Sequence, residues 1–453
     1  MLFSCSLQKK SLSTFVAIAA ISVWSAVWST ASAQTYNPDG AAQMIREHQQ
    51  LCANNYTAYD NLYDATDHTM TPAPDGYQAF YISAYMRHGS RWLIQVKDYT
   101  NPILFLEDAK QQGRLTPKGK RLLKDLHQLL QLAPSDKLGV LTDVGFEQHN
   151  GIAFRMCERF PEVFDKKAYV HARSSRVARC IKSMAEEAEV IARKGRCNVI
   201  QESGKDEWQD YLAHGSLQPE IKEAQKPMKA LIGQINDQYI HPERFIKSLM
   251  KEQKKTTEGQ KTKAEEQEFM RKVFELATNM QSHKFGIDLY QYFTEDELYD
   301  LYRNKNIYWY LRDGAAPQTG SISPWRQRWL LQDFLDAADT LVGNRQFHGA
   351  TLRFGHESCL MPLVALMELG TLGAEVQNLD TLDHVWRGSE IFPMAGNVQL
   401  IFYRPRKGPG EILVKALLNE REIALPGTPV IGPYYRWEEI RAAWRGKLAR
   451  YSF

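Results

Sequence analysis

YQAFYISAYM, residues 77–86, is followed at once by RHGSR, residues 87–91. The first segment is aromatic and apolar, and the second is polar or charged. An apolar run of strand length that stops at a polar cluster predicts a buried strand ending in a loop. This boundary decides the fold class, because the segments beyond it repeat the alternation of strand and helix.

Helix starts and further strands follow along the chain. Thr116, followed by a proline, and Thr142 are residue types that cap helix N-termini. Further strands are expected at residues 168–172, 350–354, 398–403 and 412–418, and helices at 177–193, 324–341, 358–369 and 435–448. The alternation predicts an α/β fold, with a mainly parallel sheet flanked by helices.

Residues 204–324 interrupt this alternation. Strand-like runs are scarce there, and Thr294 to Glu297 has the pattern of a capping box. Residues 251–268 are highly charged, which is typical of a solvated helix or a flexible loop. We predict an all-helical cap domain at 204–324, inserted between two parts of an α/β core at 34–203 and 325–453. Residues 37–75 are polar and rich in turn formers, and we expect them to wrap the surface.

The first 33 residues have the pattern of a secretory signal peptide. Lys9 and Lys10 precede an apolar run at 15–28, and Ala31-Ser32-Ala33 offers small residues for cleavage. A membrane anchor is the alternative, but a span needs about 20 apolar residues. We therefore expect export through a cleaved signal peptide, to the periplasm or outside the cell, and no membrane span in the mature protein.

Composition limits the classes of partner. The chain has 453 residues, of which 43% are hydrophobic and 24% charged, as in ordinary globular proteins. Without residues 1–33 its net charge is +1, which does not favour a nucleic-acid partner. The five remaining cysteines are too few for a disulfide scaffold, and no CxxC or Cys/His cluster predicts a zinc site. Cysteine pairing and oligomeric state stay open.

Three polar clusters follow three of the expected strands. They are Arg87-His88-Gly89-Ser90-Arg91, Arg173-Ser174-Ser175 and Gly355-His356-Glu357. Ligands of open α/β sheets bind at the carboxyl edge of the strands, so the clusters are expected to converge in one crevice. Convergence would gather three arginines, two histidines and one carboxylate.

This set of side chains suits phosphoryl chemistry. Guanidinium groups match phosphate oxygens and stay charged at working pH. A neutral histidine nitrogen can attack phosphorus, and a carboxyl group can then protonate the leaving oxygen and deprotonate the attacking water. His88 and Glu357 are the candidates for these two roles, and a small-molecule phosphomonoester is the expected partner.

Each cluster also has a simpler interpretation. Adjacent Arg and His residues are common in surface turns, and Arg-Ser-Ser is common at a helix N-terminus. His356-Glu357 begins like a zinc-binding HExxH helix, but Leu360 stands where the second histidine belongs. We therefore expect neither a metal nor another cofactor.

The motifs resemble those of the histidine acid phosphatases, the family that includes phytases and multiple inositol polyphosphate phosphatases. Residues 87–91 resemble the RHGxRxP signature, with Leu93 in place of its proline. Residues 141–148 resemble the LTxxGxxQ helix, 159–161 the RYP segment, and 173–175 the RST segment. Residues 355–357 combine the spacing of the distal HD motif with the glutamate of the HAE variant.

The resemblance implies a histidine phosphatase fold with a helical cap, and a metal-independent phosphomonoesterase. In that reading His88 becomes phosphorylated, Glu357 is the acid and then the base, and Arg87, Arg91, Arg173 and His356 bind phosphate. Acidic conditions would favour the reaction, because the donor must start protonated.

The substrate is less constrained than the reaction. Inositol polyphosphates such as phytate are the expected substrates, because the cap supplies many Lys and Arg residues. A general acid phosphatase acting on sugar phosphates or other monoesters is an alternative. So are a cofactor-dependent mutase, which export disfavours, and a non-catalytic phosphate-binding relative, which the mixed His-Glu motif favours.

Overall fold

The computed structural model describes residues 40–133, 135–214, 219–252 and 261–450. The expected signal peptide lies outside these residues. No helix within the described ranges is long and apolar enough to cross a membrane. The five cysteines from Cys52 to Cys359 are buried and have free thiols.

An eight-stranded sheet forms the core, in the order β3-β2-β4-β1-β5-β6-β7, with β8 paired to β6. The four strands from β3 to β1 run parallel, and the others are antiparallel to their neighbours. The α/β fold with a mainly parallel sheet flanked by helices is confirmed. The strands are β1 (Tyr77–Arg87), β2 (Tyr169–Ser174), β3 (Val199–Ser203), β4 (Gly349–Gly355), β5 (Asn397–Pro405), β6 (Leu413–Leu418), β7 (Arg421–Ile423) and β8 (Tyr435–Arg436).

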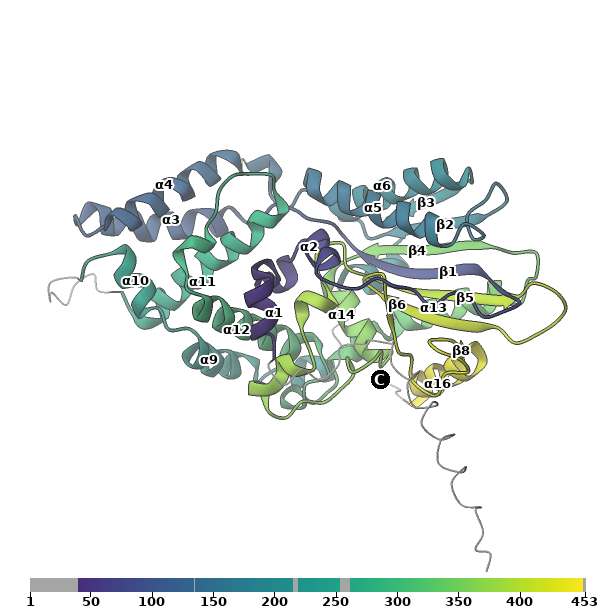
Figure 1. Cartoon of the computed structure of the whole chain (residues 1–453). Coiled ribbons are helices and arrows are strands. Elements are labelled where there is room, and N and C mark those ends of the chain that lie inside the picture. Colours follow the sequence, from purple (N-terminus) through teal and green to yellow (C-terminus); the bar gives the residue numbers. More distant parts are fainter. Residues whose placement is uncertain (1–39, 134, 215–218, 253–260, 451–453) are drawn as a thin grey trace, which may run out of the picture.

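Helices cover both faces of this sheet (Figure 1). One face packs against α5 (Asp143–Arg159) and α6 (Ala178–Gly195). The other packs against α13 (Arg328–Val342), α14 (Glu357–Leu366) and α16 (Trp437–Arg450). Apolar side chains from both layers bury the central strands β1 and β4, which is the usual state of parallel strands, whereas the edge strand β3 is partly exposed.

No strand forms among the described residues between β3 and α13, and the six α-helices of this part are called the cap helices below. They are α7 (Asp206–Gln209), α8 (Pro219–Ala224), α9 (Met228–Tyr239), α10 (Glu243–Leu249), α11 (Lys263–Asn279) and α12 (Glu295–Asp313). Part of this group shares a second apolar core with α3 (Val96–Gln111) and α4 (Pro117–Leu132), beside the sheet in Figure 1. The domain boundaries at 204 and 324 stay a prediction.

Helix starts follow the local sequence. The hydroxyl oxygens of Thr116 and Thr142 accept hydrogen bonds from the amides of Gly119 and Gly145, as N-caps do. Thr294 and Glu297 form the expected capping box at the start of α12. The predicted helix at 324–341 begins as a 3₁₀ turn at Ser323–Gln327 before α13.

The segment before β1 corrects one expectation. It forms α1 (Ala42–Glu47), the 3₁₀ segment η1 (Gln49–Tyr56) and α2 (Tyr59–Asp64). Residues 51–56 of η1 are buried rather than wrapped over the surface. The expectation was wrong because it took polar composition as a sign of exposure, whereas Asn54 finds its hydrogen-bond partner inside the protein.

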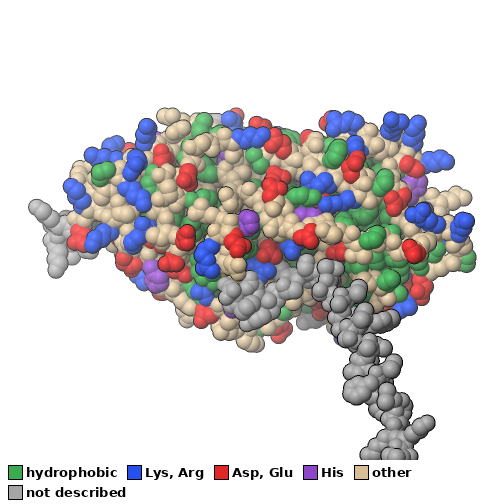
Figure 2. All heavy atoms as spheres, viewed as in Figure 1, with side chains coloured by type: hydrophobic (Ala, Val, Ile, Leu, Met, Phe, Trp, Pro, Cys, Tyr) green, Lys and Arg blue, Asp and Glu red, His purple; other side chains and the backbone are tan. Residues whose placement is uncertain are grey.

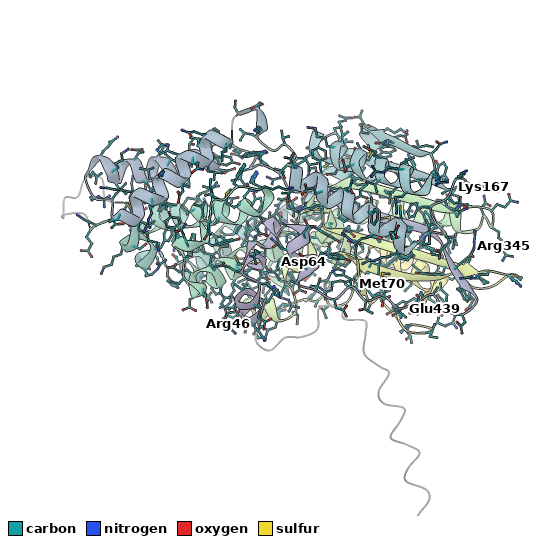
Figure 3. All side chains as sticks on the ribbon, turned by 45° about the horizontal axis from the view of Figure 1, so that its top comes forward. Arg46, Asp64, Met70, Lys167, Arg345 and Glu439 are labelled. Atoms are coloured by element: carbon teal, nitrogen blue, oxygen red, sulfur yellow. The ribbon has the colours of Figure 1, made fainter. Side chains whose placement is uncertain are left out.

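The two ends of the parallel strands differ in their surroundings. Lys167 and Arg345 precede β2 and β4, and Figure 3 places them at the end of the sheet remote from the cap helices. The carboxyl ends therefore face the cap helices. Figure 2 shows acidic and basic side chains interspersed over the face it draws.

Candidate active site

The carboxyl ends of β1 and β4 bring four predicted site residues together, Arg87, His88, His356 and Glu357. Arg87 lies opposite Gly355 in the parallel ladder, and the amide of His88 donates to the Gly355 carbonyl at 2.9 Å. The segments that leave the two strands therefore run side by side. The ring centroids of His88 and His356 are 5.4 Å apart, and Glu357 Oε2 lies 3.7 Å from His88 Nε2.

The loop after β1 is held from behind by α5 and α6. The amide of Gly89 donates to Ser183 Oγ at 3.2 Å, and that of Ser90 to Gln148 Oε1 at 2.9 Å. A Cβ at position 89 would lie 2.5 Å from the Gly145 carbonyl oxygen. Only glycine fits at this approach, so α5 can fix the loop closely.

The hydrogen bonding of His88 defines which ring nitrogen is reactive. Nδ1 lies 2.9 Å from the carbonyl oxygen of Gly89, which can only accept, so Nδ1 carries the proton. Nε2 then has a free lone pair, and it is buried without a hydrogen-bond partner among the described residues. Burial, followed by the charges of Arg179 and Arg87, holds the pKa of His88 well below its ordinary value. The imidazole is therefore neutral and nucleophilic.

Glu357 is the first residue of α14 and is ion-paired with Arg87. Its Oε2 accepts from Arg87 Nε at 3.1 Å, and its side chain is 15% exposed. Burial opposes ionisation of this carboxyl group, but Arg87 and Arg91 outweigh burial and hold its pKa well below the usual range. Glu357 is thus a carboxylate when no anion shares the site.

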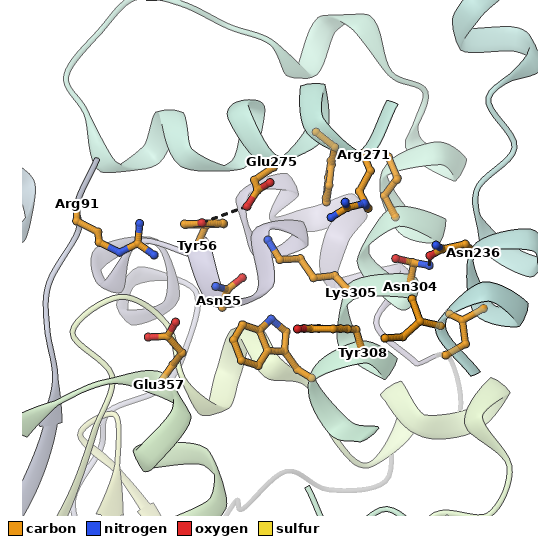
Figure 4. Close-up of a pocket in the computed structure, with 15 residues that line it drawn as sticks. Asn55, Tyr56, Arg91, Asn236, Arg271, Glu275, Asn304, Lys305, Tyr308 and Glu357 are labelled. Carbon is orange, nitrogen blue, oxygen red and sulfur yellow. Dashed lines mark hydrogen bonds between the residues drawn. The ribbon is translucent and has the colours of Figure 1, made fainter. Parts of the chain in front are cut away.

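Arg87 and Arg91 both direct their guanidinium groups toward the space beside His88 and Glu357. Arg87 is fully buried, and its Nη2 has no hydrogen-bond partner among the described residues. Arg91 is 3% exposed, donates from Nη1 to the Trp92 carbonyl, and lines the cavity beside Glu357 (Figure 4). Two buried cations with unused donors fit an anionic ligand.

Arg173 departs from the prediction, because the structure does not bring its guanidinium group to the other predicted residues. Both of its Nη atoms donate to the carboxylate of Asp333 at 3.0 Å, and its guanidinium lies over the Trp208 ring. Asp333 also binds Arg353, so Arg173 belongs to a structural ion-pair cluster. Its position at the end of β2 is as predicted, but its side chain takes another direction.

Arg179 takes the place expected of Arg173. It lies in the first turn of α6, and its Nη2 is 3.4 Å from His356 Nδ1. After burial, its charge has the largest effect on the pKa of His88. The sequence did not predict Arg179, because the polar run Arg173-Ser174-Ser175 marks the end of the strand, whereas Arg179 lies in the helix that follows and belongs to no polar cluster.

His356 lies between Arg179 and the end of β4. Its Nε2 is 3.5 Å from Ser175 Oγ, and its backbone amide donates to the Tyr85 hydroxyl at 2.8 Å. These contacts orient the ring toward His88.

A cavity of about 470 Å³ extends from these residues to the cap helices (Figure 4). Arg91 and Glu357 line one end (Figure 4). Tyr56, Lys305 and Arg271 line the part toward the cap helices, called the cap end below, and the Lys305 side chain reaches toward the middle of the cavity. Tyr56 of η1 lies beside Lys305, whose Nζ is 4.2 Å from the Tyr56 ring centroid, and the Tyr56 hydroxyl donates to Glu275 at 3.3 Å. The cavity is therefore much larger than one phosphate group, and both of its ends carry cations.

The cations at the cap end differ in character. Burial lowers the pKa of Lys305 to about 8, although Glu275 opposes this effect. Arg271 is ion-paired with Glu268 at the surface. Neither residue, nor Tyr56, belongs to a motif, and only the abundance of Lys and Arg in the cap hinted at them.

His88, His356 and Glu357 are also the one set of metal-binding side chains found among the described residues, with ligand atoms within 4.8 Å of one another. Two imidazoles and a carboxylate are common metal ligands. However, Arg87, Arg91 and Arg179 surround this set, and their positive charges oppose a cation. The residues fit an anion better than a metal ion.

The fold is that of the histidine acid phosphatases and phytases. The chain is similar to the multiple inositol polyphosphate phosphatase of Bifidobacterium longum, with 19% identity and a TM-score of 0.68 over 88% of this chain and 97% of the other. The same enzyme bound to inositol hexasulfate gives 20% identity and a TM-score of 0.67, over 83% and 94% of the two chains. The phytase of D. castellii gives 13% and 0.65, over 87% and 85%. No protein-family model and no curated protein sequence matches the chain.

Proposed function

We propose that this protein is a metal-independent phosphomonoesterase that acts through a phosphohistidine at His88. The observation that carries the proposal is the state of His88 Nε2. This nitrogen is unprotonated, has no hydrogen-bond partner among the described residues, and lies in the field of three arginines. A neutral nucleophile within a site for an anion is what attack on a phosphate ester requires.

In the first step, the Nε2 lone pair forms a bond to phosphorus and the bond from phosphorus to the ester oxygen breaks. Arg87, Arg91 and Arg179 stabilise the charge on the phosphoryl oxygens. The departing oxygen takes a proton and leaves as an alcohol. In the second step, water attacks phosphorus, the N–P bond breaks, and inorganic phosphate and neutral His88 are restored.

Glu357 moves the proton in both steps. A phosphoryl group at Nε2 competes with its carboxylate for Arg87 and partly neutralises the arginines, which raises the pKa of the carboxyl group. The proton enters with the monoanionic form of the ester, passes through Glu357 to the leaving oxygen, and returns from the attacking water. Activity should therefore be greatest below neutral pH, where the monoanion is abundant.

Inositol polyphosphates such as phytate are the proposed substrates. The cavity has room beyond the reacting phosphate, and Lys305 and Arg271 provide cations for further phosphates at the cap end. The similar structures include an inositol polyphosphate phosphatase and a phytase, which supports the same substrate class. Sugar phosphates and other monoesters remain the alternative, since they use only the end that contains His88.

The protein is further proposed to be exported. Support comes from the sequence alone, namely Lys9 and Lys10, the apolar run at 15–28 and the small residues at 31–33. N-terminal sequencing of the mature protein tests this, with Gln34 expected as the first residue.

The test of function measures phosphate release from phytate and from p-nitrophenyl phosphate in EDTA, at about pH 4 to 7. A radiolabelled phosphoryl group should be trapped on the wild-type protein after an alkaline quench, but not on His88→Ala. Loss of activity in EDTA would contradict metal independence, and labelling of His88→Ala would contradict the nucleophile. A protein that binds inorganic phosphate but cleaves no ester would be a non-catalytic binding protein.

A further inference from the structure

The direction of the Arg87 guanidinium is set by two backbone carbonyls. Its Nη1 donates to the Asn55 carbonyl at 2.6 Å and to the Phe392 carbonyl at 2.7 Å. Arg87 Nε donates a hydrogen bond to Glu357, so Nη2 is the donor that remains for a bound phosphoryl group. Movement of either carbonyl would therefore turn Nη2 away from a bound phosphoryl group.

These two carbonyls belong to segments far apart in the sequence, and Asn306 of α12 ties both segments together. Its Oδ1 accepts from Asn54 Nδ2 at 3.1 Å and from the Gly388 amide at 2.8 Å. Its Nδ2 donates to the Trp386 carbonyl at 2.8 Å. Asn54 precedes Asn55 in η1, and the amide of Phe392 donates back to the Gly388 carbonyl at 3.0 Å.

The contact between the two segments leaves little space. A Cβ at position 388 would lie 2.6 Å from Asn54 Oδ1. Asn54 itself is fully buried and has a φ of 54°, in the left-handed region that a residue adopts only when its surroundings hold it there. Asn306 is 1% exposed, so water cannot readily replace its hydrogen bonds.

We infer that Asn306 is a positioning residue for Arg87, through which a cap helix fixes the phosphate site. This inference rests on the proposed function for its kinetic test, but the binding of inorganic phosphate tests it without turnover. α12 also carries Lys305, so of two adjacent residues in one helix, one lines the cavity and the other positions Arg87.

The experiment is a double-mutant cycle between Asn306→Ala and Arg87→Gln. We expect Asn306→Ala to lower kcat/KM for p-nitrophenyl phosphate about 10- to 100-fold, and to weaken calorimetric binding of inorganic phosphate by a similar factor. In the Arg87→Gln background the same change should have less than about a 2-fold effect, because there is no guanidinium left to position.

Two further variants separate positioning from loss of folding. Gly388→Ala should lower kcat/KM and phosphate affinity as Asn306→Ala does, because the added Cβ would displace Asn54. Gln267→Ala removes a buried amide that donates to the Asn236 and Ile240 carbonyls within the cap helices. It should lower the thermal unfolding midpoint about as much as Asn306→Ala while keeping kcat/KM within about 2-fold.

Equal effects of Asn306→Ala with and without Arg87 would overturn the inference, as would unchanged phosphate affinity in Asn306→Ala. A wild-type protein that binds phosphate but hydrolyses no ester would refute the proposed function alone, and the binding cycle would still decide the role of Asn306. A wild-type protein that does not bind phosphate would refute both.

Discussion

The two ends of the cavity are built in different ways. At the sheet end, the residues come from short contiguous motifs that leave β1 and β4, and the parallel ladder places them side by side. At the cap end, Tyr56, Arg271 and Lys305 come from three elements with no shared motif. Under the proposed function, this difference implies that the residues at the strand ends would carry out the reaction, and that the residues at the cap end would determine which substrates bind.

The largest expected effect is at the sheet end. Glu357→Gln should lower kcat on phytate and alkyl phosphates about 10³-fold, because a poor leaving group needs a proton. On p-nitrophenyl phosphate, whose leaving group is stable as an anion, the loss should be less than about 10-fold. Steady-state kinetics on both substrates measure this, and equal losses would assign the proton to another residue.

The variants Arg179→Ala and Arg173→Ala compare an arginine that contacts His356 with one that is ion-paired with Asp333. Arg179→Ala should lower kcat/KM about 100-fold on every ester, since a charge-assisted contact to the phosphoryl group is lost. Arg173→Ala should change kcat/KM less than about 3-fold and act mainly on the unfolding midpoint, because its partner is Asp333. The reverse order would restore Arg173 as the phosphate ligand.

At the cap end, Lys305→Met should lower kcat/KM for phytate about 10-fold and leave that for p-nitrophenyl phosphate unchanged. The reason is that a simple monoester has no second phosphate to reach this lysine. Lys118→Met, at a lysine that does not line this cavity, is the matched control. Equal losses of kcat/KM on both substrates would contradict the idea that Lys305 binds only the additional phosphates of phytate.

The smallest expected effect is a pH dependence of the cap end. Burial lowers the pKa of Lys305 to about 8, so the lysine is charged below that pH and loses its charge as the pH rises through it. Inositol hexasulfate has no group that titrates in this range, and its affinity should fall several-fold between about pH 6 and 9. Lys305→Arg should flatten the profile, because guanidinium stays protonated. A wild-type profile that is already flat would contradict the assignment.

The sequence allowed the sheet end to be predicted because its information is local. Polar residues directly after an apolar run mark the end of a strand, and parallel strands bring such ends together. For this reason His88, His356 and Glu357 were placed correctly relative to one another. The same logic failed for Arg173, because the end of a strand does not determine the direction of a long side chain, and Asp333 attracts it.

The cap end could not be predicted because its information is spread along the chain. Tyr56 lies in a segment whose polar composition suggested exposure, and this segment packs against α11 and α12 and is hydrogen-bonded through Asn54 to Asn306, 252 residues away in the sequence. Nothing near Lys305 distinguishes it from the many solvated lysines of the cap. Its role depends on the packing of α11, α12 and η1, which a single sequence does not encode locally.

The hydrogen bond from His88 to its neighbour's carbonyl has a consequence for the chemical identity of the intermediate. Because Nδ1 is engaged with Gly89, phosphorylation would give only the isomer in which phosphorus is bonded to the ring nitrogen farther from the backbone. The covalent species would thus be regiochemically pure, and isomer-specific antibodies against phosphohistidine would recognise one form and not the other.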